Sequence, residues 1–316
     1  MQPILTGGVV LPGVGGFDRA CDKSAVLCRL ENNDLGKLTV QNGKAVVEGI
    51  DGCWQLELPE ADVLMGVYDV PKICTLIGEA RKKRVSSVCG TPDYMENAKR
   101  TVRSTPKHYA YLKIADGCDN RCSYCAIPAI RGPYKSRSME SLIDEAVCMA
   151  ETGVKEIILI AQDTTNYGMD LYGKRMLPEL CRRIALIDGI EWIRLLYLYP
   201  NGINDELLEV LKNEPKMCRY IDLPLQHIDD AMMHSMNRHT DSREVKSVLK
   251  KLREIGGFTL RTSLIVGYPG ETEEMFDSLC EFVKESEFDR LGAFTYSQEE
   301  GTVAAELPDQ IDERVK

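Results

Sequence analysis

The sequence predicts an α/β protein with a sheet of parallel strands, and three observations lead to this prediction. Short runs rich in β-branched and aromatic residues alternate with amphipathic stretches from residue 107 onward. The alternation repeats six times, and such repeats produce parallel strands with right-handed crossovers. The unusual polar motifs all follow the carboxyl ends of these strands, where α/β barrels place their active-site loops. A doubly wound sheet and a partial barrel both satisfy this pattern.

The expected elements alternate along the chain. Strands are expected at residues 110–115, 156–161, 193–198, 220–225, 259–266 and 291–296. Helices are expected between them, at residues 139–151, 176–187, 205–212, 242–255 and 272–285. These elements define one domain over residues 107–316. The segment before it is less regular, and Asn42-Gly43 there marks a possible hairpin between short strands.

Composition limits the class of protein. The 316 residues can form one large domain or a large and a small one, and 44% hydrophobic with 28% charged residues is typical of a soluble globular protein. No apolar run approaches the roughly 18 residues that span a membrane, and no signal peptide is visible. Twelve cysteines without a secretory signal therefore indicate a reducing cytoplasm, where thiols bind metals or pack in the core. Core packing is the expected role of Cys148, Cys181, Cys218 and Cys280.

Three cysteines follow the first predicted strand at the spacing C-x3-C-x2-C, and they are Cys118, Cys122 and Cys125. Four thiolates would complete a structural zinc site or a ferredoxin-type cluster. Three thiolates on one loop can hold three irons of a [4Fe-4S] cube and leave the fourth iron open to a ligand, which implies chemistry. The alternatives are a zinc knuckle completed by a distant residue such as His108, or thiols that are close by chance.

Charge is distributed unevenly around this loop. The whole chain carries a net charge of -10, which gives no support to broad binding of nucleic acid. Between residues 97 and 137, however, nine Lys or Arg residues stand against Asp116 and Asp119 alone. Such a basic region can attract an anionic substrate segment, RNA phosphate or the carboxylate of a cofactor. An ordinary solvated surface explains the same residues equally well.

Polar residues at the ends of the second and third strands are candidate ligand contacts. Gln162 and Asp163 open a polar run after the second strand, and their side chains suit the amino and hydroxyl groups of a ligand. Arg194 lies within the otherwise apolar third strand, where a guanidinium needs a carboxylate partner from a ligand or from a nearby acidic side chain. For each position taken singly, an ordinary turn or structural pair is as reasonable as a ligand contact.

The fourth and fifth strands end in two further motifs. The fourth is followed by Pro-Leu-Gln and His227, and a neutral histidine there is more often a core residue than a ligand. The fifth is followed by Gly267 and, four positions later, Glu271. Glycine lets the backbone approach a nucleoside closely, whereas the glutamate also suits the start of the following helix. All these motifs are expected at the same edge of the sheet, where the strands end, and this common position favours a binding site.

The cysteine motif, with Tyr124 before its last cysteine, resembles the signature of the radical S-adenosylmethionine (SAM) enzymes. In that family the open iron chelates the amino and carboxylate groups of SAM, and one electron from the [4Fe-4S] cluster cleaves the sulfonium. The resemblance implies a radical SAM partial (βα)6 barrel in which Cys118, Cys122 and Cys125 bind the cluster. It also implies SAM or substrate contacts for Tyr124 at the adenine, Gln162 and Asp163 at the amino group or substrate, Arg194 at the carboxylate, and Gly267 with Glu271 at the nucleoside.

Longer motifs narrow the resemblance to the methylthiotransferases within that family. These motifs are TPKHYAYLKIADGCDNRCSYCAIPAIRGPYKSR at 105–137, LIAQDTTNYG at 159–168, IDLPLQHI at 221–228, RTSLIVGYPGETEE at 261–274 and YSQEEGT at 296–302. The chain looks most like the members that methylthiolate the β-carbon of an aspartate in protein twelve of the small ribosomal subunit. Members that modify isopentenyladenosine in tRNA typically show GQNV and PVQSGS where this chain has AQDT and PLQHI. tRNA is therefore a substrate only under the alternative interpretation.

The family resemblance implies partners and a second cofactor. Two SAM molecules act in different roles, one as methyl donor and one as radical source. An electron donor such as flavodoxin or ferredoxin supplies the reducing electron. A second [4Fe-4S] cluster, held by three cysteines of an N-terminal domain, carries the sulfur that is transferred.

The N-terminal residues depart from the family pattern. Residues 1–60 read as an atypical, truncated or divergent remnant of that domain, in which Cys21 and Cys53 weakly echo two of the three ligands. Residues 61–106 read as the end of the domain and a linker. The family also continues into a small TRAM-like β-barrel that we do not expect after Lys316. A non-catalytic remnant that binds a ribosomal partner is therefore a further alternative.

Overall fold

The computed structural model describes residues 105–316 throughout, and before them residues 62–65, 72–83, 85–87 and the backbone of five short strands. The chain divides into two compact units. One combines residues 1–98, 124–132 and 298–305, and the other combines residues 99–123, 133–297 and 306–316. The domain boundaries predicted at residues 60 and 106 stay predictions.

The first unit contains short strands and two described helices. Its strands are β1 (Leu5–Thr6), β2 (Val9–Val10), β3 (Lys37–Gln41), β4 (Lys44–Glu48), β5 (Cys53–Glu57), β6 (Val63–Met65) and β7 (Val85–Ser87). β3, β4 and β5 form an antiparallel sheet in which Gln41 lies opposite Lys44, so the hairpin predicted at Asn42-Gly43 is confirmed. β6 and β7 are parallel and are joined through α1 (Ile73–Ala80), while α2 (Ile127–Arg131) follows the last cysteine of the motif.

The second unit is built on six parallel strands. These are β8 (Tyr109–Lys113), β11 (Glu156–Ile160), β12 (Trp192–Leu195), β13 (Tyr220–Asp222), β14 (Thr259–Val266) and β15 (Arg290–Thr295). Three of them pair in the order β8-β11-β12 and three in the order β13-β14-β15. Backbone bonds connect the two sets, because Ile193 N donates to Lys216 O at 2.8 Å and Leu198 N to Asp222 O at 2.9 Å. The strands therefore follow one another in chain order, as the predicted partial (βα)6 barrel requires.

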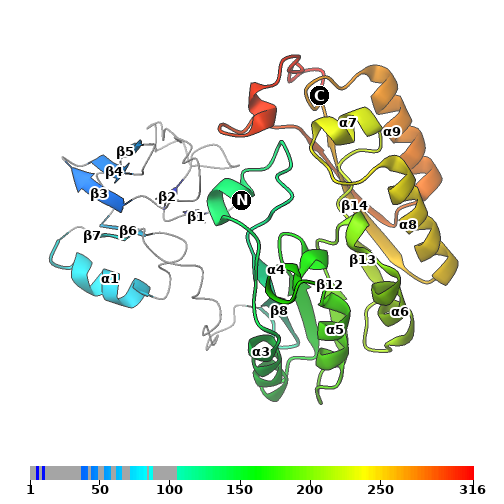
Figure 1. Ribbon diagram of the computed structural model, residues 1–316, viewed down its shortest axis with the longest axis horizontal. Helices are drawn as coiled ribbons and strands as arrows, with labels where there is room; N and C mark the ends of the chain where they lie inside the picture. Colours follow the sequence, from blue (N-terminus) through cyan, green and yellow to red (C-terminus); the bar gives the residue numbers. More distant parts are fainter. Residues whose placement is uncertain are drawn as a thin grey trace. The chain divides into compact units, whose positions relative to one another are not determined.

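Five helices connect the strands and lie along one side of them (Figure 1). They are α3 (Met139–Glu151), α5 (Leu177–Ala185), α6 (Asp205–Asn213), α8 (Ser242–Ile255) and α9 (Glu273–Ser286). All five were expected within a few residues of these bounds. Four of them begin at a side chain that accepts a backbone N–H of the first turn, which is the usual N-cap, and the four are Ser138, Asn204, Asp241 and Thr272.

Short elements surround the rim at the carboxyl ends of the strands. The first two are β9 (Ala115–Asp116) and β10 (Lys135–Ser136), which pair antiparallel and so close the base of the cysteine loop. The others are η3 (Thr164–Asn166), α4 (Met169–Tyr172), η4 (Pro200–Gly202), α7 (Asp230–Ser235) and η5 (Val303–Glu306). Of these, α7 is important for the site, because the segment after it contacts the cysteine loop.

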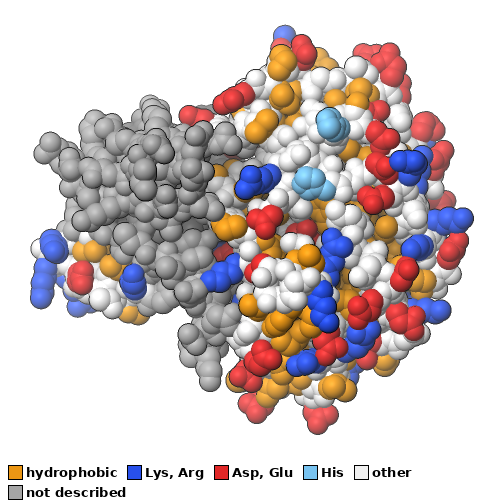
Figure 2. All heavy atoms as spheres, in the orientation of Figure 1, with side chains coloured by type: hydrophobic (Ala, Val, Ile, Leu, Met, Phe, Trp, Pro, Cys, Tyr) orange, Lys and Arg blue, Asp and Glu red, His pale blue; other side chains and the backbone are white. Residues whose placement is uncertain are grey.

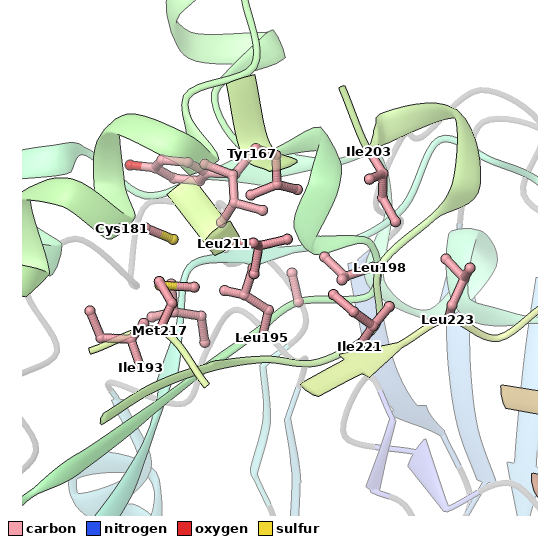
Figure 3. Close-up of a cluster of buried hydrophobic side chains, with 14 of the residues drawn as sticks. Tyr167, Cys181, Ile193, Leu195, Leu198, Ile203, Leu211, Met217, Ile221 and Leu223 are labelled. Carbon is pink, nitrogen blue, oxygen red and sulfur yellow. The ribbon is translucent and has the colours of Figure 1, made fainter. Parts of the chain in front are cut away.

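The core lies between the strands and their helices. Alternate strand residues point into it, as in β8, where Ala110 and Leu112 are buried while Tyr109, Tyr111 and Lys113 are only half-buried. Figure 3 shows part of this core, to which β12, β13, α5 and α6 contribute. The labelled side chains are Tyr167, Cys181, Ile193, Leu195, Leu198, Ile203, Leu211, Met217, Ile221 and Leu223.

The cysteines expected in the core differ in burial. Cys181 is fully buried, and burial raises the pKa of its thiol to about 12. Cys218 and Cys280 are half-buried, whereas Cys148 is exposed. The prediction for Cys148 is wrong because its position on α3 faces away from the strands.

The charged surface of the described part is mixed. Figure 2 shows acidic and basic side chains interspersed over the coloured residues of the visible face. Two cations of the basic region have internal partners: Lys113 pairs with Asp116 at 2.7 Å, and Arg137 pairs with Glu145 at 2.6 Å. None of the helices in the described ranges has both the length and the apolar content of a membrane span.

Candidate functional site

The three motif cysteines follow β9 on one continuous stretch of chain. Cys118, Cys122 and Cys125 are all partly exposed, so their sulfurs lie near the surface of the loop. Among the residues that the structure describes, no three acidic, histidine or cysteine side chains converge on a single ion. A cube-shaped cluster takes each thiolate on a different iron, so its ligands stand farther apart than the ligands of one zinc ion.

The start of the cysteine loop is anchored by Asp116. This side chain is 3% exposed, and its Oδ1 accepts from Gly117 N at 3.1 Å and from Gln162 Nε2 at 3.4 Å. Gln162 therefore lies beside the loop. Its Oε1 is buried with no hydrogen-bond partner among the described residues. Buried acceptors are normally satisfied, so this oxygen fits a ligand donor such as the amino group of SAM.

The middle of the loop is held by Asp163. Its Oδ2 accepts from Asn120 Nδ2 at 2.9 Å, and its Oδ1 accepts from Thr165 N at 3.0 Å. Its backbone oxygen accepts from the hydroxyl of Tyr134 at 2.9 Å. Burial, followed by the charge of Asp163, raises the pKa of Tyr134 far above its usual value, so the hydroxyl stays a donor. Asp163 lies beside the cysteine loop, and both of its carboxylate oxygens contact the protein.

The end of the loop is held by residues 235–239, which we call the clamp segment. Ser123 N donates to Met236 O at 3.0 Å, and Ser123 Oγ donates to Ser235 O at 2.8 Å. Asn237 Nδ2 donates to Arg121 O at 2.8 Å across 116 positions of sequence. Arg121 and Asn237 both have positive φ angles, a conformation that Asn tolerates better than most residues.

The clamp segment is the part of the site that sequence reasoning missed. Its last residues add two contacts, because His239 Nε2 lies 3.0 Å from Asn120 O and Arg238 Nη1 lies 3.8 Å from Cys122 Sγ. In the sequence these residues read as an ordinary connection between two helices. Asn237 is the one local signal of an unusual turn, because asparagine tolerates a positive φ. It does not reveal that the turn contacts the cysteine loop.

The turn after β14 is held by a buried histidine–glutamate pair. His227 Nδ1 accepts from Asp229 N at 3.0 Å, so its proton is assigned to Nε2, which donates to Glu271 Oε1 at 3.0 Å. Glu271 Oε2 also accepts from Gly267 N. His227 is fully buried. The predicted nucleoside contacts Gly267 and Glu271 are thus brought together, and the glutamate shapes the turn on which Gly267 has a φ of 71°.

Arg194 lies at the other end of the strands. Its Nε is 2.5 Å from Glu156 Oε1, and its guanidinium stacks over Tyr220 at 5.0 Å. Glu156 is the first residue of β11, whereas the cysteine loop follows the last residue of its neighbour β8. The nearby carboxylate that an arginine in this strand needs is therefore Glu156. The structure does not bring Arg194 to the rim.

The zinc alternative loses its proposed fourth ligand. His108 precedes β8 and packs edge-on against Tyr109 at 5.2 Å. The five residues of β8, which span about 16 Å at roughly 3.3 Å per residue, lie between His108 and the cysteine loop, and Ile114 and β9 follow them. His108 is therefore too far from the thiols to share one ion with them.

The remaining predicted residues lie in the first unit. Tyr124 is half-buried. Cys21 lies outside the described residues. Cys53 is the first residue of β5, of which only the backbone is described. Their assignment to a second cluster stays a prediction.

A family model agrees with this site. The model of the radical SAM superfamily matches residues 112–283, more than half of the chain, and the match includes the cysteine loop and the rim. The chain belongs to the radical SAM superfamily. Members of this superfamily use a [4Fe-4S] cluster and SAM. The three partly exposed motif cysteines suit the cluster, and the Gln162 oxygen, which has no partner among the described residues, suits SAM.

Two curated relatives carry the same name. The chain is 50% identical over 271 residues to the ribosomal protein uS12 methylthiotransferase RimO of Heliobacterium modesticaldum, covering 85% of this chain and 59% of the relative. It is 51% identical over 264 residues to the protein of that name from Geobacter sulfurreducens, covering 82% of this chain and 59% of the relative. The chain thus spans about three fifths of the length of these relatives.

Solved structures agree on the radical SAM fold. The radical SAM methyltransferase TsrM from Kitasatospora setae, solved with cobalamin and a [4Fe-4S] cluster, superposes with a TM-score of 0.50 at 19% identity. The superposition covers 59% of this chain and 36% of TsrM. At this identity the likeness concerns the fold alone.

Proposed function

We propose that this chain is a radical SAM methylthiotransferase that modifies ribosomal protein uS12. One observation carries the proposal. Over more than four fifths of this chain, about half of the aligned residues are identical to those of proteins with that name. The motifs at the rim support the same reaction. They further favour the β-carbon of an aspartate as the modified position and a ribosomal protein rather than tRNA as the substrate.

The chain's own residues have distinct roles in this proposal. Cys118, Cys122 and Cys125 bind the [4Fe-4S] cluster, which with SAM supplies the one-electron cleavage that starts the reaction. Gln162 Oε1 accepts a hydrogen bond from the SAM amino group, because it is buried beside the loop and has no partner in the part of the chain that the structure describes. Tyr124 covers the adenine.

The acidic residues of the predicted site hold the loop and the turn that line it. Asp163 holds the cysteine loop, and Glu271 holds the turn of Gly267, at which the family resemblance implies a nucleoside contact. For Arg194 we propose a structural pair with Glu156 in place of a SAM contact.

The N-terminal part carries the second half of the proposal. Cys21 and Cys53 contribute to a second cluster that supplies the sulfur, within a divergent domain of residues 1–60 that is joined through residues 61–106 to the radical SAM domain of residues 107–316. A low-potential donor such as flavodoxin or ferredoxin supplies the electron. The twelve cysteines favour the reducing cytoplasm as the location.

Iron analysis tests the cofactor assignment. After anaerobic reconstitution, iron and acid-labile sulfide are measured with Mössbauer spectra for the wild type and for the Cys118, Cys122, Cys125→Ala variant. About eight irons falling to about four supports both clusters, whereas about four falling to none supports the radical SAM cluster alone. An unchanged iron content in the variant contradicts the assignment of the three cysteines.

Product analysis tests the reaction. Reconstituted protein with SAM and a strong reductant should release 5'-deoxyadenosine, and a uS12 substrate should gain one methylthio group by mass spectrometry. Modification of tRNA in its place would favour the alternative substrate. No 5'-deoxyadenosine from protein with a full cluster would contradict the proposed enzyme activity and favour a non-catalytic remnant.

A further inference from the structure

One arginine of the clamp segment is directed at a motif cysteine. Arg238 Nη1 lies 3.8 Å from Cys122 Sγ, and its Nη2 donates to Pro224 O at 2.7 Å. Its guanidinium carbon stands 4.1 Å from the centre of the Tyr199 ring, within stacking distance. The three contacts come from three different segments: the cysteine loop, the end of β13 and the end of β12.

The tyrosine platform is itself fixed. Tyr199 is 5% exposed, and its hydroxyl accepts from His239 N at 3.0 Å. Burial raises the pKa of Tyr199 to about 12, so the ring stays neutral at any physiological pH. A planar guanidinium that rests on a fixed ring and donates to a backbone carbonyl has little freedom to turn. Arg238 therefore keeps its charge beside Cys122.

Such a charge affects a cluster bound at this thiol. Adding one electron to an iron–sulfur cluster adds one negative charge, and hydrogen bonds to the ligand sulfurs and nearby cations favour the reduced state. The arginine side chain is half-buried, where water screens its charge less than at an exposed site. A positive charge at this position therefore makes reduction easier.

We propose that Arg238 is a positioning residue that holds a positive charge against Cys122 and thereby raises the reduction potential of the cluster. The inference rests on the proposed function, because it requires a cluster at the three motif cysteines. Its role is to bring the reduction of the cluster within reach of a low-potential one-electron donor. The same contacts also hold the cysteine loop against the clamp segment.

A potentiometric titration of the reconstituted full chain tests the inference. The reduced cluster is followed by its electron paramagnetic resonance signal, with and without SAM, in the wild type and in the Arg238→Gln and Arg238→Lys variants. We expect the midpoint potential of Arg238→Gln to fall by at least about 59 mV, the equivalent of a tenfold loss in the one-electron equilibrium. Arg238→Lys keeps the charge and should stay within a third of that shift.

Arg219→Gln is the matched control. Arg219 also donates to a backbone carbonyl, Gly256 O at 2.8 Å, and also stacks on an aromatic ring, Phe258 at 5.7 Å. It lies just before the first residue of β13, at the end of the strand opposite the rim. Loss of a stacked arginine there should leave the midpoint potential unchanged.

The outcomes separate this inference from the proposed function. A wild type whose iron does not depend on the three cysteines overturns the proposed site itself. If the wild type binds its cluster and the Arg238→Gln variant has the same midpoint potential as the wild type, the inference about Arg238 is wrong while the proposed function stands. Equal falls in the Gln and Lys variants also overturn the inference, because geometry rather than charge would then matter. If Arg238→Gln takes up no cluster, assembly at wild-type potential in Arg238→Lys supports the charge, and failure in both contradicts it.

Discussion

Two arginines of the same unit, each stacked on a tyrosine, show how the two ends of the strands differ. Arg194 at the amino end rests on Tyr220 and is bound to the carboxylate of Glu156, a residue of the adjacent strand. Arg238 at the carboxyl end rests on Tyr199 and points to Cys122, 116 positions away in sequence. The amino-end pair stabilises strand pairing, whereas the rim arginine joins distant segments around thiols. Similar local chemistry thus has different uses, decided by the segments that meet.

Replacing Asp163 should have the largest effect, because this buried carboxylate accepts hydrogen bonds from both the cysteine loop and the segment after β11. We expect Asp163→Ala to destabilise the protein by about 2–4 kcal/mol, since Asn120 and Thr165 lose a buried charged acceptor. Chemical denaturation measures the change. Asp163→Asn keeps one acceptor oxygen and should lose less, and Asp144→Asn on the exposed face of α3 should lose almost nothing. Equal midpoints for Asp163→Ala and Asp144→Asn would show that the rim does not depend on this carboxylate.

The buried pair of His227 and Glu271 gives the next largest effect. His227→Ala leaves Glu271 and the N–H of Asp229 without their partner and opens a cavity, so we expect a loss of about 2–3 kcal/mol. The affinity for SAM should fall as well, because Gly267 then loses its fixed turn. Equilibrium denaturation and SAM binding are the measurements. The exposed His234→Ala is the control, and equal stability of the two variants would contradict the role of the pair.

Replacing Arg194 tests the amino end and should cost less, about 1–2 kcal/mol, because the pair is only partly buried. A double-mutant cycle of Arg194→Met and Glu156→Gln isolates their coupling. The structure leads us to expect that the SAM concentration giving half the maximal rate of single-turnover cleavage does not change. A higher concentration with unchanged stability would restore the role at the SAM carboxylate that the sequence suggested.

A charge outside both regions provides the baseline. Asp241 caps α8, and its backbone bond to Glu244, aided by Arg243, lowers the pKa of its carboxyl. A lowered folded pKa contributes stability above the unfolded value of about 3.8, and this contribution is lost as the pH falls through the folded pKa. Asn also caps helices, so Asp241→Asn should lower the melting temperature slightly at pH 7, and this difference should shrink as the pH falls below the unfolded value of about 3.8 and through the folded pKa. A difference that persists in acid would show that the charge is not its cause.

The fold was largely predictable because its signals are local. Helices α3 and α8 and strand β14 have the bounds that periodicity and capping residues predicted. The alternation of strands and helices predicted parallel strands but left a doubly wound sheet and a barrel open, and the family resemblance favoured the barrel. Cys148 was misjudged because an amphipathic pattern does not define the edge of a buried face.

The site divides differently between sequence and structure. Spacing alone predicted the three cysteines and the rim positions Gln162 and Gly267 as site residues, because ligand spacing and strand ends can be read from consecutive residues. Only the tertiary structure decided that Arg194 pairs with Glu156 and that Asp163 holds the loop. It also decided that Arg238 meets Cys122. These contacts join residues tens to more than a hundred positions apart, and the chemistry of a single arginine or aspartate does not specify which distant partner the folded chain will bring to it.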